Sequence, residues 1–169
     1  MKVRLLAVVS LLAVSFALGT GNLFAAHAPK AASAKKFDGL ADAALAAMKK
    51  RAAELNVQGV AVVSYAPGDT IHGWFSKMAV VGHMEDQPTA TSKGNNLLGI
   101  AYAKASEMAE TLVDSGTAKR PPMTGEFGWQ GGVTARGKTG ILIVAFSGGK
   151  SEDDVQVSKA GLAVLEPAL

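Results

Sequence analysis

The sequence predicts an α+β domain with a mainly antiparallel sheet and helices packed on it. Three segments repeat apolar residues at helical spacing, and four shorter segments are apolar runs of strand length. Turn-forming residues join the strands in two consecutive pairs, so both pairs are expected to be hairpins. The predicted order is therefore α-β-β-α-β-β-α, and 169 residues are enough for one such domain.

The domain is predicted over residues 37–169, after an export segment. Residues 1–28 start with Lys2 and Arg4, continue with an uncharged apolar run and end with small residues, as a secretory signal and its cleavage region do. The run is shorter than the ~20 residues of a membrane-spanning helix, and an uncleaved anchor is the alternative. Residues 29–36 are predicted to be a flexible leader. We expect a periplasmic or secreted protein with no membrane span after cleavage.

The composition excludes several classes of function. The chain has no cysteine, which excludes disulfides, thiolate metal sites and cysteine nucleophiles. The chain has 17 basic and 14 acidic residues, and once Lys2 and Arg4 leave with the signal the remaining 15 basic residues are nearly balanced by the acidic ones. The basic run at 49–51 falls on the first helix, where a solvated face is the simpler interpretation. We therefore expect no nucleic-acid partner.

The first half of the domain is predicted to be a helix followed by a hairpin. The helix covers residues 37–55, with Asp38 as its N-terminal cap. The Val-rich run at 57–66 predicts a strand buried on both faces, and Pro-Gly-Asp at 67–69 predicts a turn. The partner strand is expected over 70–81.

Side chains of this partner strand are expected to alternate between two faces. One face carries Ile71, Gly73, Phe75 and Lys77, and the other carries His72, Trp74, Ser76, Met78 and Val80. A polar loop is predicted over 82–92, and it contains His83.

A second helix and the start of a second hairpin are predicted next. Asn95 or Asn96 is expected to cap the helix, which runs to about residue 114. The third strand is expected over 126–135, where Gly131-Gly132 marks a bulge or a close approach.

The last predicted elements are a strand and a helix. Residues 139–147 form the most apolar strand of the chain, which Gly148-Gly149 ends. Ser151 is expected to cap the third helix, with Asp154 as the second member of a capping box. Pro167 ends that helix.

Three common kinds of site fit the sequence poorly. The Gly-rich turn at 147–151 lacks the spacing of a phosphate-binding P-loop, and the acids after it would repel a phosphate. No serine has the setting of a nucleophile elbow, and nothing points to a Ser-His-Asp triad. His83 with Glu85 and Asp86 lacks a second histidine at ligand spacing, so a solvated loop is favoured over an isolated metal site.

Haem is the more promising ligand. It needs an axial His, Met, Cys or Tyr and an apolar slot for the macrocycle. His72 and His83 are the candidate iron ligands, and Met78 is a further candidate beside them. The aromatic candidates for the walls of the slot are Trp74, Phe75, Phe127 and Trp129. The alternative is that the histidines are structural and the methionine is a core residue.

The C-terminal third carries a series of motifs that resembles a known family. The series is, in order, GEFGWQGGV at 125–133, TGILIVAFSGG at 139–149, SEDD at 151–154 and KAGLA at 159–163. With the N-terminal helix, the VAVVSYAPGD hairpin and a helix containing Lys104-Ala105, it resembles the GlcG/HbpS family, also found as the C-terminal domain of PduO-type proteins. The resemblance covers about residues 37–166.

The resemblance implies a profilin-like α+β fold, often assembled as a homo-oligomer. It also implies haem binding in some members, and haem degradation or redox sensing in a few. No family motif falls on His72 or His83, so both candidates rest on residue chemistry alone. We predict an exported haem-binding or haem-handling protein with a small-molecule ligand. The alternatives are a non-haem small-molecule binding or accessory protein on the same fold and, less favoured, a haem-degrading or small-acid enzyme.

Overall fold

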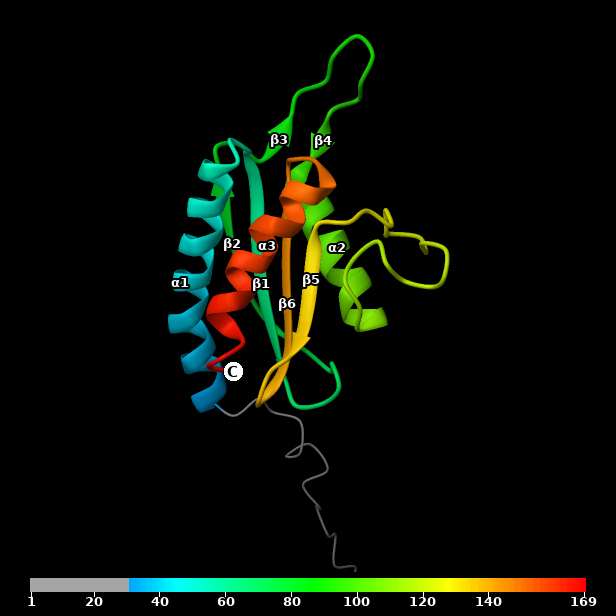
Figure 1. Ribbon diagram of the computed structural model, residues 1–169. Helices are drawn as coiled ribbons and strands as arrows, with labels where there is room; N and C mark the ends of the chain where they lie inside the picture. The colour runs from blue at the N-terminus through cyan, green and yellow to red at the C-terminus, as the bar shows by residue number, and fades with distance from the viewer. Residues whose placement is uncertain (1–30) are drawn as a thin grey trace, which may run out of the picture.

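A central sheet with helices on both faces forms the body of the protein (Figure 1). The structure, a computed structural model, describes residues 31–169, with side chains from residue 34 onward. The predicted signal and cleavage region, residues 1–28, therefore lies outside the described residues. In the part of the chain that is described, no helix is both long enough and apolar enough to cross a membrane.

The observed elements confirm the predicted fold class and the predicted order of the main helices and strands. In chain order they are α1 (Ala31–Glu54), β1 (Gly59–Pro67), β2 (Phe75–Val81), β3 (Glu85–Asp86), β4 (Asn95–Asn96), α2 (Leu97–Thr111), β5 (Gly132–Arg136), β6 (Gly140–Ser147) and α3 (Ser151–Leu165). The pair β3 and β4 is an addition: it forms a small separate hairpin that leads into α2.

The main sheet has the strand order β2-β1-β6-β5, and all neighbouring strands are antiparallel. The two central strands, β1 and β6, are buried along almost their whole length, which confirms the burial on both faces predicted for the run at 57–66. Because successive side chains of a strand point to opposite faces, each face of the sheet has its own hydrophobic cluster. Val63 and Val144 face α1 and α3, whereas Val62 and Ile143 face α2.

Helices α1 and α3 lie side by side on one face of the sheet (Figure 1). The predicted apolar stripe of α1 is buried there, and the ring of Phe37 stacks on Tyr65 of β1 with centroids 5.8 Å apart. The helices approach closely at Gly161, where an added Cβ would lie 2.7 Å from the Cγ and Sδ atoms of Met48. This face therefore depends on small residues between the helices.

The start of α1 corrects the prediction for Asp38. The helix begins at Ala31, so residues 31–36 of the predicted flexible leader are helical. Asp38 therefore lies inside the helix rather than at its cap. The Asp38 carboxylate instead lies 2.6 Å from the Lys77 ammonium on β2. This ion pair links α1 to the edge strand β2.

Two strands are shorter than predicted. In the register of the first hairpin, Gly73 would lie opposite Pro67, which has no N–H, and His72 opposite Gly68, whose φ is +88°. In the second hairpin, the Gly131 carbonyl still accepts from Phe146 N–H, but Trp129 would lie opposite Gly148, beyond the end of β6. His72 and Trp129 therefore lie on loops.

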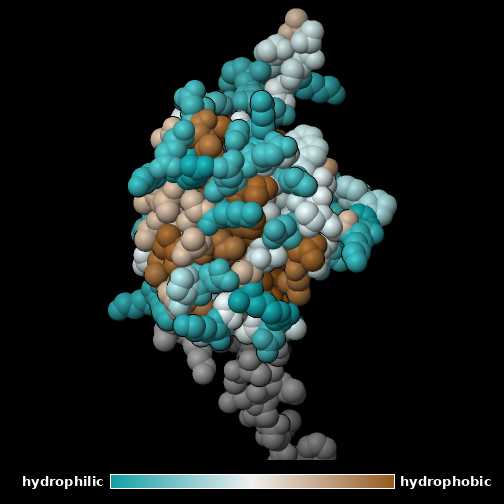
Figure 2. All heavy atoms as spheres, in the orientation of Figure 1, coloured by the Kyte–Doolittle hydropathy of each residue, from teal (hydrophilic) through white to brown (hydrophobic). Residues whose placement is uncertain are grey.

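The surface over α1 and α3 mixes hydrophobic and hydrophilic side chains (Figure 2). The chain between β3 and β4 extends beyond the end of the main sheet (Figure 1), and its exposed residues are mostly polar. The same end of the molecule contains the first turn of α3 (Figure 1).

Gly161→Leu tests the close packing of α1 and α3. The added side chain must displace Met48 and Val144, so we expect the free energy of unfolding to fall by about 1–3 kcal/mol. Gly39→Leu is the matched control, because an added Cβ at Gly39 meets nothing within 4 Å. It should stabilise α1 by about 0.5–1 kcal/mol through helix propensity. Urea denaturation measures both, and equal effects at the two positions would contradict the packing.

Candidate functional site

The two candidate histidines lie at opposite ends of β2. His72 is on the loop before β2, and His83 follows the strand by two residues. The seven residues of β2 alone span roughly 20 Å at about 3.3 Å per residue. The fold therefore does not bring His72 and His83 to one iron atom.

The other predicted haem contacts are divided between the two faces of the sheet. Trp74 and Met78 pack against the cluster under α2, whereas Phe75 packs against the cluster under α1 and α3. The Phe75 ring lies 6.4 Å from that of Phe37, between centroids. Trp74 and Phe75 thus do not form two walls of one slot.

The predicted pair Phe127 and Trp129 does come together, in the loop before β5. Their ring centroids are 4.7 Å apart, and each residue is 48% exposed. Trp129 also borders a small cavity described below. This aromatic pair lies in a different loop from either candidate histidine.

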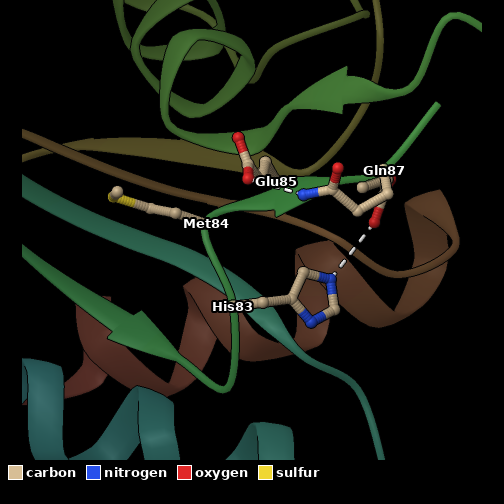
Figure 3. Close-up of a pocket in the computed structure, with 5 residues that line it drawn as sticks. His83, Met84, Glu85 and Gln87 are labelled. Atoms are coloured by element: carbon tan, nitrogen blue, oxygen red, sulfur yellow. Dashed lines mark hydrogen bonds and ion pairs between the residues drawn. The ribbon is translucent and has the colours of Figure 1, made fainter.

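His83 borders an open cavity of about 620 Å³ formed by residues 83–87 (Figure 3). Its Nδ1 lies 2.8 Å from Gln58 Oε1, and its Nε2 lies 3.1 Å from Asp86 Oδ1. Asn95 Nδ2 donates to the other oxygen of Asp86 at 2.8 Å. Figure 3 shows the side chain of Met84, which is 46% exposed, pointing away from the imidazole.

This arrangement suits a single axial ligand to a bound cofactor. The cavity is wide open, so a cofactor bound there would stay partly exposed to solvent. In the tautomer with the proton on Nδ1, His83 would donate to Gln58 and keep the Nε2 lone pair for a ligand, once Asp86 turns aside. Among residues 31–169, no group of three or more His, Asp or Glu side chains is arranged to hold a metal ion.

A second, smaller cavity lies next to this one and contains a buried ion pair. Its volume is about 160 Å³. Lys104 Nζ donates to Asp154 Oδ2 at 2.7 Å and to the backbone carbonyl of Phe146 at 2.8 Å. The side chains of Lys104 and Asp154 are only 3% and 4% exposed. Asp86 borders both cavities.

The glycine at position 131 makes room for the pair. An added Cβ at Gly131, whose φ is +139°, would lie 2.2 Å from Lys104 Nζ, so the predicted close approach at Gly131-Gly132 is present and is made by side chains. Asp154 Oδ1 accepts a hydrogen bond from Gly149 N–H at 2.8 Å. Asp154 therefore holds the turn before α3.

The predicted cap at Ser151 is wrong. The N-cap residue of α3 is Lys150, which makes no side-chain cap hydrogen bond, and Ser151 is already helical. The bond from Gly149 to Asp154 takes over part of the capping function. Asn96 caps α2 as predicted, since its side chain accepts from Gly99 N–H.

Burial disfavours both charges of the pair. Desolvation lowers the pKa of the Lys104 ammonium and raises the pKa of the Asp154 carboxyl, and the attraction between the partners opposes both shifts. Both shifts lower the cost of moving a proton from Lys104 to Asp154 relative to a solvated pair.

The sequence contains a signal for this pair that apolar periodicity does not reveal, namely a charged residue on an otherwise apolar helix stripe. Lys104 occupies the apolar stripe of α2 between Ala101 and Met108, where a charge is exceptional. Asp154 likewise precedes Val157 on the buried face of α3. Two opposite charges on two buried stripes predict an internal ion pair.

The loop that carries Trp129 and Gln130 to the small cavity is held by charged groups. Arg120 donates through both terminal nitrogens to the two carboxylate oxygens of Glu126, at 2.8 and 2.9 Å. The guanidinium of Arg120, helped by the N–H of Met123, lowers the pKa of Glu126 to about 2. The loop is also tied to α2, because Glu107 accepts from Gly116 N–H at 2.8 Å.

Lys104→Met tests the buried pair. It leaves the Asp154 carboxylate without its counter-charge, and we expect a loss of about 3–5 kcal/mol in the free energy of unfolding. The double variant Lys104→Met with Asp154→Asn should recover part of this loss, since Asn still accepts from Gly149. Lys159→Met, at an exposed position, is the control and should change little. Additive effects of the two substitutions in a denaturant cycle would argue against the pair.

Glu126→Gln tests the loop through its pH dependence. Because the folded pKa of Glu126 is about 2 against an ordinary 4.5, ionised Glu126 stabilises the protein above about pH 4.5. The difference in the free energy of unfolding between the wild type and Glu126→Gln should be largest at pH 7. It should shrink as the pH falls from 4.5 toward 2. Thermal unfolding at several pH values measures it, with exposed Glu166→Gln as the control. A difference that does not change over this range would refute the assignment.

The fold is shared with solved structures at low sequence identity. No family model and no curated protein matches the chain. The chain resembles the crystal structure of Klebsiella pneumoniae protein ORFY, of family model DUF336, with a TM-score of 0.51 and 19% identity over 78% of this chain and 90% of that one. It also resembles a PduOC–haem complex, with a TM-score of 0.50 and 17% identity over 77% of this chain and 91% of that one. The protein therefore has the same α+β fold as these two proteins.

Proposed function

We propose that the protein is an exported haem-binding protein in which His83 is the axial ligand. The observation that carries the proposal is the exposed imidazole of His83 at the edge of a cavity of about 620 Å³. The fold is also that of a protein solved as a haem complex. The secretory pattern of residues 1–28 supports export, and haem handling outside the cytoplasm agrees with it.

His83 is favoured over His72 because of its surroundings. His83 lies beside the larger cavity, next to the half-exposed apolar side chain of Met84. His72 lies on the loop at the other end of β2, where its Nε2 is 3.1 Å from Thr70 Oγ1. Met78 contributes to the core under α2 in this proposal and does not reach the iron.

The residues around His83 would hold the ring in the form that iron requires. Gln58 Oε1 accepts the Nδ1 proton, which leaves the lone pair on Nε2. Asp86 must release Nε2 for the iron, and Asn95 keeps hold of its second carboxylate oxygen. Haem, when bound, would supply an iron centre for electron transfer or for binding a further small ligand.

A haemin titration of the protein without residues 1–28 tests the proposal. We expect a saturating Soret band with one equivalent of haemin, and His83→Ala should weaken binding on the order of tenfold or more. His72→Ala is the matched control and should bind as the wild type does. A band that His72→Ala abolishes, or a titration with no saturable band, would reject His83 as the ligand.

The proposal also includes self-association of the protein. We expect a homo-oligomer, and sizing chromatography with light scattering of the apo and haemin-loaded protein measures it. A monomer in both states would reject this part and leave the ligand assignment intact.

A further inference from the structure

We propose that Lys104 forms an imine with a small, uncharged hydroxyaldehyde or hydroxyketone bound in the 160 Å³ cavity. The proposal concerns a different site from the haem ligand and does not depend on it. It rests on a buried amine, a carboxylate in contact with that amine, and a cavity that reaches both.

The position of Lys104 leaves one direction of its nitrogen for a ligand. An ammonium has three N–H donors. Among the described residues, the hydrogen-bond partners of Nζ are Asp154 and the carbonyl of Phe146. Lys104 also borders the cavity, so its remaining position is available to a bound molecule there.

Asp154 is placed to exchange the proton that imine formation requires. Its Oδ2 lies 2.7 Å from Nζ, and its Oδ1 is fixed by Gly149. Burial lowers the pKa of the Lys104 ammonium and raises the pKa of the Asp154 carboxyl, so transfer of a proton between them, which gives the nucleophilic neutral amine, costs less than at a solvated lysine. Surface lysines remain ammonium ions at neutral pH because water solvates their charge.

The step balances without an oxidant or a reductant. The amine nitrogen adds to the carbonyl carbon and gives a carbinolamine. The carbinolamine then loses its hydroxyl group as water with a proton from Asp154, and the C=N bond forms. In total, one ammonium and one carbonyl give one protonated imine and one water, and Asp154 is a carboxylate again.

The cavity selects the chemical class of the carbonyl compound. Its volume equals about five water molecules at roughly 30 Å³ each, which suits a molecule of a few carbons and excludes haem. Asn95, Gln130 and Ser151 border it with groups that can hydrogen-bond a hydroxyl.

Negative charge around the cavity also restricts which carbonyl compound can bind. Asp86 and Asp154 line the cavity, and Glu152 and Asp153 follow it on the first turn of α3. Four carboxylates at or near the site oppose a second anion, so a neutral sugar-like aldehyde is favoured over a 2-oxo acid.

Reductive trapping on the wild-type protein tests the inference. The protein is incubated at pH 7 with glycolaldehyde and cyanoborohydride, which reduces an imine to a stable amine, and the labelled lysines are mapped by peptide mass spectrometry. We expect a hydroxyethyl group on Lys104 on the order of tenfold faster than on exposed Lys159. Labelling of Lys159 and other surface lysines with Lys104 unmodified would overturn the proposal.

Two controls separate the site from general amine reactivity. The double variant Lys104→Met with Asp154→Asn should lose the fast label, whereas Lys159→Met should keep it. Anionic glyoxylate should label Lys104 more slowly than glycolaldehyde does, and equal rates would overturn the assignment to a neutral compound. The wild-type map needs no substitution, so poor folding of a variant does not prevent the test.

Discussion

The buried ion pair between Lys104 and Asp154 links parts of the fold that the sheet otherwise separates. Lys104 belongs to α2 on one face, and Asp154 belongs to α3, which packs on the other. The pair also holds the carbonyl of Phe146 at the end of β6 and the N–H of Gly149 in the next turn. Desolvation makes such a pair costly, so its value lies in fixing one arrangement of these elements. This arrangement requires glycine at position 131, because an added Cβ there would lie 2.2 Å from Lys104 Nζ.

The two cavities described above lie at the same end of the sheet. The hairpin of β3 and β4, the turn into α3 and the loop with Trp129 meet there, and Asp86 borders both cavities. Asp86 bonds to the His83 ring with one oxygen and to Asn95 with the other. A ligand that displaces Asp86 from His83 therefore changes the wall of the smaller cavity.

The sequence predicted the architecture well because the core alternates regularly. The fully apolar runs of β1 and β6 and the stripes of the three helices determined the fold class and element order. Element ends were less predictable, since the starts of β2 and β5 depend on pairing with another strand. The ligand site was also less predictable: residue types suggested His72 and His83 equally, and only the structure shows that His83 borders the larger cavity. Lys104 and Asp154 are 50 residues apart in sequence, so their contact is a property of the tertiary structure.

The proposed binding of haem beside His83 is tested most directly by locating the bound ligand. Gallium protoporphyrin is a diamagnetic analogue of haem, and backbone amide chemical shifts of the labelled protein report where it binds. We predict that the largest shifts fall on residues 83–87, with smaller ones at Gln58 and Asn95. Shifts centred on the loop before β2, or no saturable shifts, would contradict the account.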